Sequence, residues 1–136
     1  MNNETVSMLI KKAIEARECS YSPYSGFAVG AALLCSDGTV YTGANIENAS
    51  YTPTVCAERV AIFSAVHNGH RDFEAIAIVG GNSKLPIEDF CSPCGVCLQV
   101  MSEFCKGDFK ILLSDGKTDR VMTLDDMLPN RFSFEK

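Results

Sequence analysis

The nearly all-apolar run FEAIAIVGG, residues 73–81, constrains the fold more than any other stretch of the chain. Its short length and its Ile and Val residues predict a strand, and its apolar character predicts that both faces of this strand are buried. A strand with two buried faces needs helices on both sides of its sheet. The run therefore predicts an α/β fold.

The rest of the chain supplies suitable elements, because segments of helical and strand periodicity alternate along it. An early hairpin is expected to be antiparallel, whereas strands separated by helices are expected to pair in parallel. We therefore predict a three-layer α/β/α sandwich with a mixed, about five-stranded sheet, formed by one domain over residues 1–136. The expected elements are a helix over 4–17, strands over 27–36 and 40–46, a helix over 53–67, a strand over 73–81, a helix over 93–104, strands over 109–114 and 120–124, and a short helix capped at Thr123.

Turn and cap residues mark the expected boundaries. Asp37-Gly38 predicts a two-residue hairpin turn. Thr52-Pro53 and Ser92-Pro93 each predict a capping residue followed by the first residue of a helix.

Composition narrows the class of partner. The net charge of −5 and the absence of a basic run argue against binding to a nucleic acid polymer. No stretch approaches the roughly 20 apolar residues that span a bilayer, and the charged N-terminus does not resemble a signal peptide. An odd count of seven cysteines suits metal ligands plus buried thiols in a reducing compartment. We therefore expect a cytoplasmic protein with a small-molecule ligand and no membrane partner.

Cys56, Cys94 and Cys97 are the residues that indicate chemistry. Cys94 and Cys97 are three apart, which places them on one face of a helix within its first turn. Cys56 is expected in the first turn of the preceding helix. Helix starts carry exposed N–H groups and partial positive charge, which favour thiolates. Two helix starts at one point would therefore bring together three thiolates, a good site for zinc.

Other interpretations of the cysteines compete with this one. An isolated CxxC is equally compatible with zinc, a redox pair or chance, although a redox pair leaves Cys56 and Glu58 unexplained. A structural zinc site normally takes four protein ligands. His67 and His70 are candidates for the fourth, but they lie about three helical turns from Cys56, and we expect both to be exposed. Three ligands would leave an open position for catalysis. The remaining cysteines are interpreted as small apolar residues; these are Cys19, Cys35, Cys91 and Cys105.

Glu58 favours the catalytic interpretation. Alone, it would be an ordinary acid at a helix start, stabilised by the helix dipole. Beside a zinc site, its carboxylate can take a proton from an activated water and deliver it to a substrate. Together with PCxxC at 93–97, it matches the zinc deaminase signature.

The chain resembles the cytidine deaminase family, in its short, homotetrameric form with three cysteine ligands. The resemblance covers nearly the whole chain and rests on YSPYSGFAVGAALL, NIENASY, CAER, SPCGVC and DMLPNRF. The zinc signature alone marks the wider deaminase superfamily, whereas NIEN, the Phe of SGFAVGAAL and LPxxF together point to free nucleosides. The resemblance implies hydrolytic deamination of cytidine and 2′-deoxycytidine to uridine and 2′-deoxyuridine plus ammonia, in pyrimidine salvage.

The resemblance also implies roles for the residues around the metal. Cys56, Cys94 and Cys97 would bind one Zn²⁺ per subunit, and Glu58 would move protons between the attacking water and the base. Arg59 would donate hydrogen bonds to the ligand sulfurs and so reduce their charge.

The resemblance also implies which residues bind the substrate. Some of them belong to a neighbouring copy of the chain. A homotetramer with shared sites is the assembly that the resemblance implies. The residues concerned are Asn45 and Glu47 for the ribose, Phe27 for the pyrimidine, the backbone N–H of Ala57 for the base carbonyl, and Phe132, with Tyr51 at the same junction, for the neighbouring subunit.

Two departures and three rival hypotheses remain. Leu98 stands where many relatives carry arginine, and Val96 where alanine is more usual, which alters charge and packing beside the site.

Blasticidin S deaminases share the small fold and the cysteine zinc site, and TVCAERVAIFSAVHNG resembles them locally, but NIEN favours plain nucleosides. An enzyme acting on polynucleotides lacks support from basic patches. A structural zinc module or an inactive relative is disfavoured by the intact Glu58.

Overall fold

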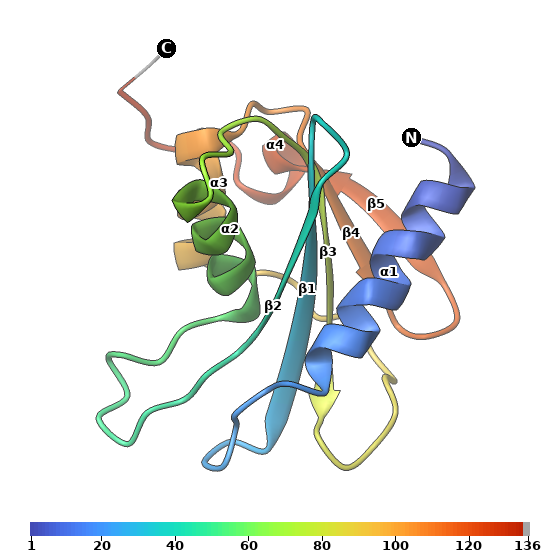
Figure 1. Ribbon diagram of the computed structural model, residues 1–136, viewed down its shortest axis with the longest axis vertical. Helices are drawn as coiled ribbons and strands as arrows, with labels where there is room; N and C mark the ends of the chain where they lie inside the picture. The colour runs from blue at the N-terminus through green and yellow to red at the C-terminus, as the bar shows by residue number, and fades with distance from the viewer. Residues whose placement is uncertain (135–136) are drawn as a thin grey trace.

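The computed structural model describes residues 1–134 and shows one mixed sheet covered by helices (Figure 1). Within the described residues the strand order is β2-β1-β3-β4-β5, so β3 is central. The predicted α/β class and five-stranded mixed sheet are confirmed. The elements are α1 (Asn3–Arg17), β1 (Phe27–Cys35), β2 (Val40–Ala44), α2 (Ala57–His67), β3 (Phe73–Asn82), α3 (Gly95–Phe104), β4 (Lys110–Ser114), β5 (Asp119–Thr123) and α4 (Leu124–Met127).

The two faces of the sheet bury separate cores. Ile76 and Ile78 of β3 pack with α2 and α3, whereas Ala75, Ala77 and Val79 pack with α1. Figure 1 shows α1 on one side of the sheet and α2 and α3 on the other. These five β3 residues are fully buried, which confirms the prediction that this strand has two buried faces.

Strand pairing brings the starts of α2 and α3 to one end of the sheet. β1 is antiparallel to both β2 and β3, with Ala44 opposite Gly30 and Asn82 opposite Phe27. β2 and β3 therefore both end where β1 begins, and the chain enters α2 and α3 from loops at this end. The pairs β3–β4 and β4–β5 are parallel and antiparallel, respectively, which gives the mixed sheet.

The two middle helices start later than the sequence predicted. Helix α2 begins at Ala57 rather than Pro53, because Val55 and Ile46 exchange backbone hydrogen bonds of 2.9 and 3.0 Å that hold this segment extended. Helix α3 begins at Gly95 because Cys94 is extended, with ψ of 166°. The expected caps at Thr52 and Ser92 were therefore wrong.

The hairpin between β1 and β2 was predicted with a two-residue turn but has a longer one. The backbone N–H of Cys35 donates to the carbonyl of Thr39, so three residues, 36–38, form the loop. Gly38 has φ of 93°, a conformation that suits glycine in three-residue loops.

Close packing of α2 on β2 depends on Gly43. A Cβ at this position would lie 2.5 Å from the carbonyl oxygen of Ala57 and 2.7 Å from the nitrogen of Ala61. Both are backbone atoms, so a larger residue would push the start of α2 away from the sheet. Gly43 therefore fixes where the first turn of α2 lies.

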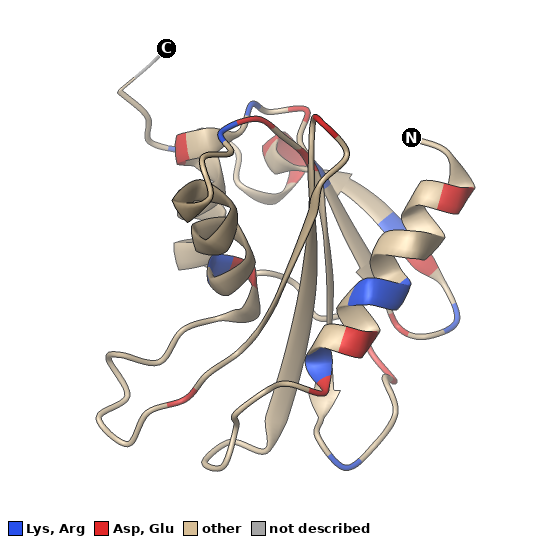
Figure 2. Ribbon diagram, viewed as in Figure 1, with Lys and Arg blue, Asp and Glu red and all other residues tan. Residues whose placement is uncertain are grey.

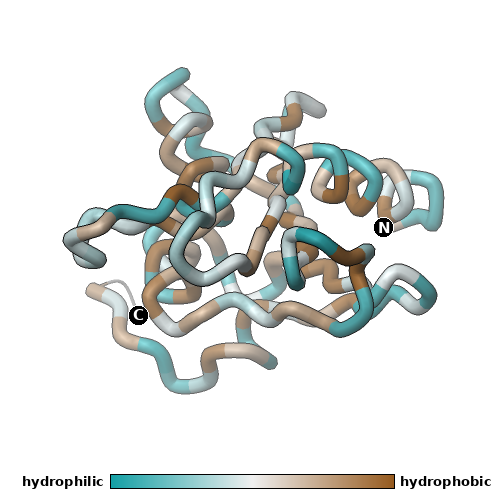
Figure 3. Tube along the Cα trace, turned by 90° about the horizontal axis from the view of Figure 1, so that it is seen from below, coloured by the Kyte–Doolittle hydropathy of each residue, from teal (hydrophilic) through white to brown (hydrophobic). Residues whose placement is uncertain are grey.

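Charge and hydropathy are unevenly distributed over the helices. Figure 2 shows both signs of charge along α1, whereas α2 and α3 carry few charged residues. In Figure 3 the hydrophobic segments run through the interior, and the loops that project outward are mostly white to teal. In residues 1–134 there is no helix with the length and apolar character needed to cross a bilayer.

Arg17, at the end of α1, is a buried charged residue that ties three segments together. Its Nε donates to the carbonyl of Ala28 at 3.1 Å, and Nη2 donates to the carbonyls of Asn82 and Leu85. These bonds fix the start of β1 to the end of β3 and to the loop that follows. Charge-assisted bonds of this kind are stronger than neutral ones.

We predict that Arg17→Met lowers the free energy of unfolding by about 2–4 kcal/mol, because it leaves three carbonyls without their donor. Lys12→Met, on the exposed face of the same helix, is the control and should change stability by less than about 0.5 kcal/mol. Urea denaturation of both variants measures the difference. Equal stability of the two would show that Arg17 is dispensable.

Candidate zinc and active site

Cys56, Cys94 and Cys97 come together at the starts of α2 and α3. The sulfur atoms of Cys56 and Cys94 lie 4.0 Å apart, and those of Cys94 and Cys97 lie 3.6 Å apart. All three sulfurs lie within 4.8 Å of one another, although Cys56 is 38 residues from Cys94 in the sequence. The structure thus brings together the three residues for which metal ligation was predicted.

Two of these cysteines are helix caps rather than members of the first turn. Cys56 caps α2 and Cys94 caps α3, both with extended backbone, and neither side chain makes a capping bond within the described chain. Each sulfur is therefore free for another partner while it lies beside the exposed N–H groups of its helix. Cys97 is the third residue of α3, one turn further on.

The local electrostatics favour thiolate at this cluster. A hydrogen bond from Cys97 lowers the pKa of the Cys56 thiol to about 5, and Arg59 acts in the same direction. The same bond, together with burial, raises the pKa of Cys97. The pair thus shares one proton, which a divalent cation would displace.

Arg59 lies against the sulfur cluster. Its Nη2 donates to the Cys56 sulfur at 3.4 Å. Its Nε is buried and has no hydrogen-bond partner among residues 1–134. The guanidinium therefore directs charge at the thiolates, the position that its predicted role requires.

Glu58 is buried next to the cluster, with only 4% of its surface exposed. Burial, with a smaller contribution from the charge of Cys56, raises the pKa of its carboxyl to about 6. Cys91 is close enough for the charge of Glu58 to affect its thiol. Burial, with a smaller contribution from that charge, raises the pKa of the Cys91 thiol to about 11. Cys91 is thus a neutral thiol.

Asn45 and Glu47 follow the end of β2 and bind the loop before β1. The amide oxygen of Asn45 accepts bonds from the Ser20 hydroxyl at 2.5 Å and the Val29 N–H at 2.9 Å, and its Nδ2 donates to the Phe27 carbonyl. One N–H of the amide remains for another acceptor. The sequence gives no sign of these three partners, which lie 16 to 25 residues away from Asn45 along the chain.

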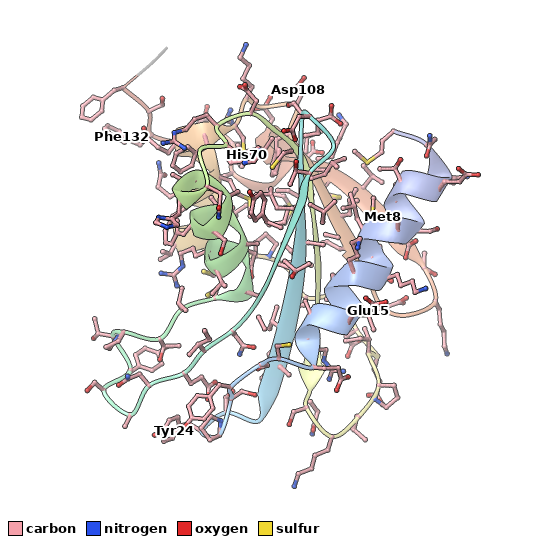
Figure 4. The ribbon with its side chains drawn as sticks, viewed as in Figure 1. Met8, Glu15, Tyr24, His70, Asp108 and Phe132 are labelled. Carbon is pink, nitrogen blue, oxygen red and sulfur yellow. The ribbon has the colours of Figure 1, made fainter. Side chains whose placement is uncertain are left out.

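Glu47 holds the same loop through its carboxylate. It accepts bonds from the backbone N–H groups of Tyr24 and Ser25 and from the Ser25 hydroxyl. These bonds, led by that of the Ser25 hydroxyl, lower the pKa of Glu47. Figure 4 shows Tyr24 at the outer end of this loop. The serines of SYSPYSG were the available sequence signal, but nothing in the sequence pairs them with residues 45 and 47.

The other predicted substrate residues are placed as follows. Phe27 is part-exposed at the start of β1, opposite Asn82. Ala57 is the first residue of α2, so its N–H has no intrahelical acceptor. Tyr51 is 82% exposed and has φ of 63°, an uncommon conformation for a residue with a side chain.

Phe132 projects from the tail near α3, and its backbone carbonyl accepts a bond of 3.0 Å from Gln99 (Figure 4). The residue is 64% exposed, and its ring meets that of Phe134 edge to face, with the ring centroids 5.3 Å apart. Of the two departures beside the metal site, Leu98 is buried in the core, whereas Val96 is exposed.

The expectations for the histidines and the other cysteines were partly wrong. His67 is exposed as expected, but His70 is half-buried and lies in a separate cluster with Cys35 and Asp37. Cys35 is buried and Cys105 is half-buried, whereas Cys19 is exposed and cannot be a core residue. Cys19 follows the end of α1, where the chain turns outward.

The donor set fits a zinc ion. Ligands at about 2.3 Å in tetrahedral directions lie about 3.8 Å apart, close to the sulfur separations of 4.0 Å and 3.6 Å in this cluster. Within the described residues, this cluster contains three cysteines and no fourth His, Cys, Asp or Glu. A tetrahedral ion bound by the three thiolates would therefore keep one coordination position open. An open position is typical of catalytic rather than structural zinc.

Comparison with known proteins identifies the family. The family described as "Cytidine and deoxycytidylate deaminase zinc-binding region" matches residues 3–113. A cytidine deaminase of Halalkalibacterium halodurans is 52% identical over 129 residues, covering 94% of each chain. The crystal structure of cytidine deaminase from Burkholderia pseudomallei superposes with a TM-score of 0.84 at 44% identity, covering 97% of this chain and all of that one. A blasticidin-S deaminase of Bacillus cereus is 32% identical and covers 77% of this chain and 76% of that protein.

The chain belongs to this zinc-binding deaminase family. The predicted resemblance is therefore confirmed, and the three cysteines are positioned to bind one metal ion.

We predict that Arg59→Ala lowers deaminase turnover by about 10–100-fold while zinc remains bound, because the Cys56 thiolate loses the donor that drains its charge. Arg71→Ala, which removes an arginine that binds only backbone carbonyls at the far end of α2, is the control. Turnover and zinc content are measured together. Normal turnover in the Arg59 variant would contradict the role.

Proposed function

We propose that this chain catalyses the hydrolytic deamination of cytidine and 2′-deoxycytidine, with one zinc ion per subunit, as a step of pyrimidine salvage in the cytoplasm. One observation carries the proposal: the buried carboxylate of Glu58 lies in the first turn of a helix that is capped by one of three clustered cysteines. All seven cysteines are free, which suits a reducing compartment.

Proton transfer is the task of Glu58 in this reaction. A bound zinc ion supplies Lewis-acid activation of water. Glu58 takes a proton from the attacking water and delivers it to N3 of cytosine. It then takes the proton of the hydroxyl group that the attack has added at C4 and delivers it to the amine, which leaves as ammonia while the C4 carbonyl forms. Nucleoside and water thus give uridine or 2′-deoxyuridine and ammonia. A pKa of about 6 suits a group that must both accept and release a proton near neutrality.

Recognition of the nucleoside falls to residues at the same end of the sheet. Asn45 retains one N–H donor, and Glu47 remains ionised because three donors stabilise its carboxylate. Both suit a ribose hydroxyl. Phe27 offers a part-exposed ring to the pyrimidine, and the N–H of Ala57 offers a donor to the base carbonyl. Because Asn45 and Glu47 also brace the loop before β1, their removal would disturb the position of Phe27 as well.

We predict that Glu58→Gln lowers turnover by about 10²–10⁴-fold with zinc retained, because the amide cannot carry the proton. Zinc-loaded protein is incubated with cytidine, 2′-deoxycytidine and blasticidin S in parallel, and ammonia release is followed. Glu103→Gln, an exposed acid on α3, is the control and should behave as the unaltered protein.

The substrate comparison separates this proposal from its rival. Turnover of blasticidin S alone would assign the chain to the other type of deaminase. Zinc-loaded protein that turns over none of the three compounds would overturn the proposed reaction.

We also infer a homotetramer in which neighbouring subunits complete each other's sites. Phe132 and Phe134 are 64% and 94% exposed, a large apolar surface for the tail of a small protein. Phe63 of α2 and Val96 of α3 are exposed on helices with few charges, which suits a face covered by another copy. The family resemblance supplies the assembly, and these exposed residues support it.

We predict that Phe132→Ala lowers kcat/KM by about tenfold, because the substrate site loses one aromatic contact. We also predict that assemblies containing both Phe132→Ala and Glu58→Gln subunits regain activity. In a mixed assembly, subunits with Phe132→Ala keep Glu58, and Glu58→Gln neighbours supply Phe132. Co-expressed assemblies of verified mixed composition should therefore exceed the activity of both parents. Phe134→Ala is the matched control for loss of a tail aromatic. A monomer in solution, or no recovery in mixed assemblies, would contradict the shared site.

A further inference from the structure

A second cluster of metal-ligating side chains lies away from the zinc cysteines. One ligand atom from each of Cys35, Asp37 and His70 lies within 4.8 Å of the others. Cys35 ends β1, Asp37 lies in the hairpin loop, and His70 follows the end of α2. Figure 4 shows His70 where the tip of the β1–β2 hairpin meets the end of α2, at the opposite end of the molecule from Tyr24. The catalytic cluster lies at the other end of α2, about 15 Å away along the helix axis.

Backbone hydrogen bonds fix all three residues. The N–H of Cys35 donates to Thr39 at 2.8 Å, and the N–H of Thr39 donates to Oδ1 of Asp37 at 3.0 Å, which leaves Oδ2 facing Nε2 of His70 at 3.1 Å. The N–H of His70 donates to the carbonyl of Ala65 at 3.0 Å, after a turn at Gly69 with φ of 90°. Little movement is needed to surround a cation.

Tyr41 completes the surroundings of the histidine. Its hydroxyl lies 3.2 Å from Nδ1 of His70, and the two rings meet edge to face at 5.2 Å. When Nε2 binds a metal, Nδ1 must carry the proton, and the Tyr41 hydroxyl can accept that hydrogen bond. Metal-binding histidines nearly always have such a partner on the second ring nitrogen.

We propose that Cys35, Asp37 and His70 form a second site for a divalent transition metal. Sulfur, imidazole nitrogen and carboxylate oxygen together favour Zn²⁺, Co²⁺ or Ni²⁺ over Mg²⁺ or Ca²⁺, which take oxygen ligands. Asp37 is exposed and His70 half-buried, so a cation can enter from solvent. A bound cation joins the hairpin loop to the residue that follows α2.

Binding at this site is weaker than at the catalytic cluster. Burial, with the charge of Asp37 adding to it, raises the pKa of the Cys35 thiol. The incoming cation must displace that thiol proton, as well as the one on Nε2 of His70. Within residues 1–134, neither a helix N-terminus nor an arginine is recorded as a donor to the Cys35 sulfur, so its thiolate lacks the stabilisation that Arg59 gives Cys56.

A simpler arrangement accounts for part of the geometry. An Asp37–His70 ion pair in which Nδ1 donates to the Tyr41 hydroxyl uses both ring nitrogens without a metal. It makes no use of the Cys35 sulfur. Participation of Cys35 therefore distinguishes the metal site from the ion pair.

The test is a Co²⁺ titration of the zinc-loaded full chain, followed by thiolate-to-cobalt charge-transfer absorbance and by elemental analysis. We expect one Co²⁺ per subunit to bind while the zinc content stays at one, with a rise in the thermal unfolding temperature. Cys35→Ser and His70→Gln should abolish this second equivalent and keep the zinc. Tyr41→Phe should weaken it about 10–100-fold, since the partner of Nδ1 is lost.

Cys19→Ser and His67→Gln are the matched controls, because both residues are exposed and lie outside the cluster. Both should bind Co²⁺ as the unaltered protein does. Total metal that stays at one per subunit would overturn the second site. So would cobalt binding that survives in the folded Cys35→Ser and His70→Gln variants, because the cation would then lie elsewhere. If Cys35→Ser does not fold, His70→Gln and Tyr41→Phe decide the outcome.

Discussion

The convergence of two helix N-termini is the constraint on which the active site depends. Three thiolates and Zn²⁺ sum to one negative charge, which would weaken zinc as a Lewis acid. Cys56 and Cys94 counter this by occupying cap positions, where their sulfurs lie beside unpaired N–H groups of α2 and α3. The sheet makes the convergence possible, because β2 and β3 end at the same end and Gly43 lets α2 pack closely on β2. Arg59 adds a charged donor to the Cys56 sulfur from the side of α2.

The same arrangement gives Glu58 its environment. The helix start that places Cys56 in the sulfur cluster also buries the Glu58 carboxylate two residues later, and burial raises the pKa of that carboxyl to about 6. The cysteine cluster and the Glu58 carboxylate therefore cannot be moved independently of each other. Loop residues, in contrast, are held by their own network: Asn45 and Glu47 anchor the segment before β1, and Arg17 anchors the start of β1 to the end of β3. In the proposed function, residues at the helix starts carry the chemistry, and the residues that brace the loop before β1 bind the substrate.

Much of the fold could be predicted, because local patterns and tertiary packing agree. The run at 73–81 predicted a central strand, and Thr123 forms the expected capping box with Asp126. The start of α2 was predicted four residues too early, because pairing of Val55 with Ile46 overrides the local preference of Pro53 for a first helical turn. The three cysteines were predicted as one cluster because their spacing matches a known signature. The second cluster had no such signature, and Asp37 and His70 are 33 residues apart in the sequence. Only the folded hairpin brings them together.

Helix α2 is held at both ends by long-range polar contacts rather than along its length. At its start, Cys56 joins a sulfur cluster with residues from α3; just beyond its end, His70 bonds to the hairpin loop and to Tyr41 of β2. Between its two ends, α2 packs Ala61, Ile62 and Ala65 into the core, and this packing fixes the distance of the helix from the sheet. Apolar packing resists sliding of the helix along its axis less than directional bonds do. The 11-residue helix has the cysteine cluster at its start and the His70 contacts just beyond its end. Directional contacts near both ends thus add to the apolar packing that holds α2 on the sheet.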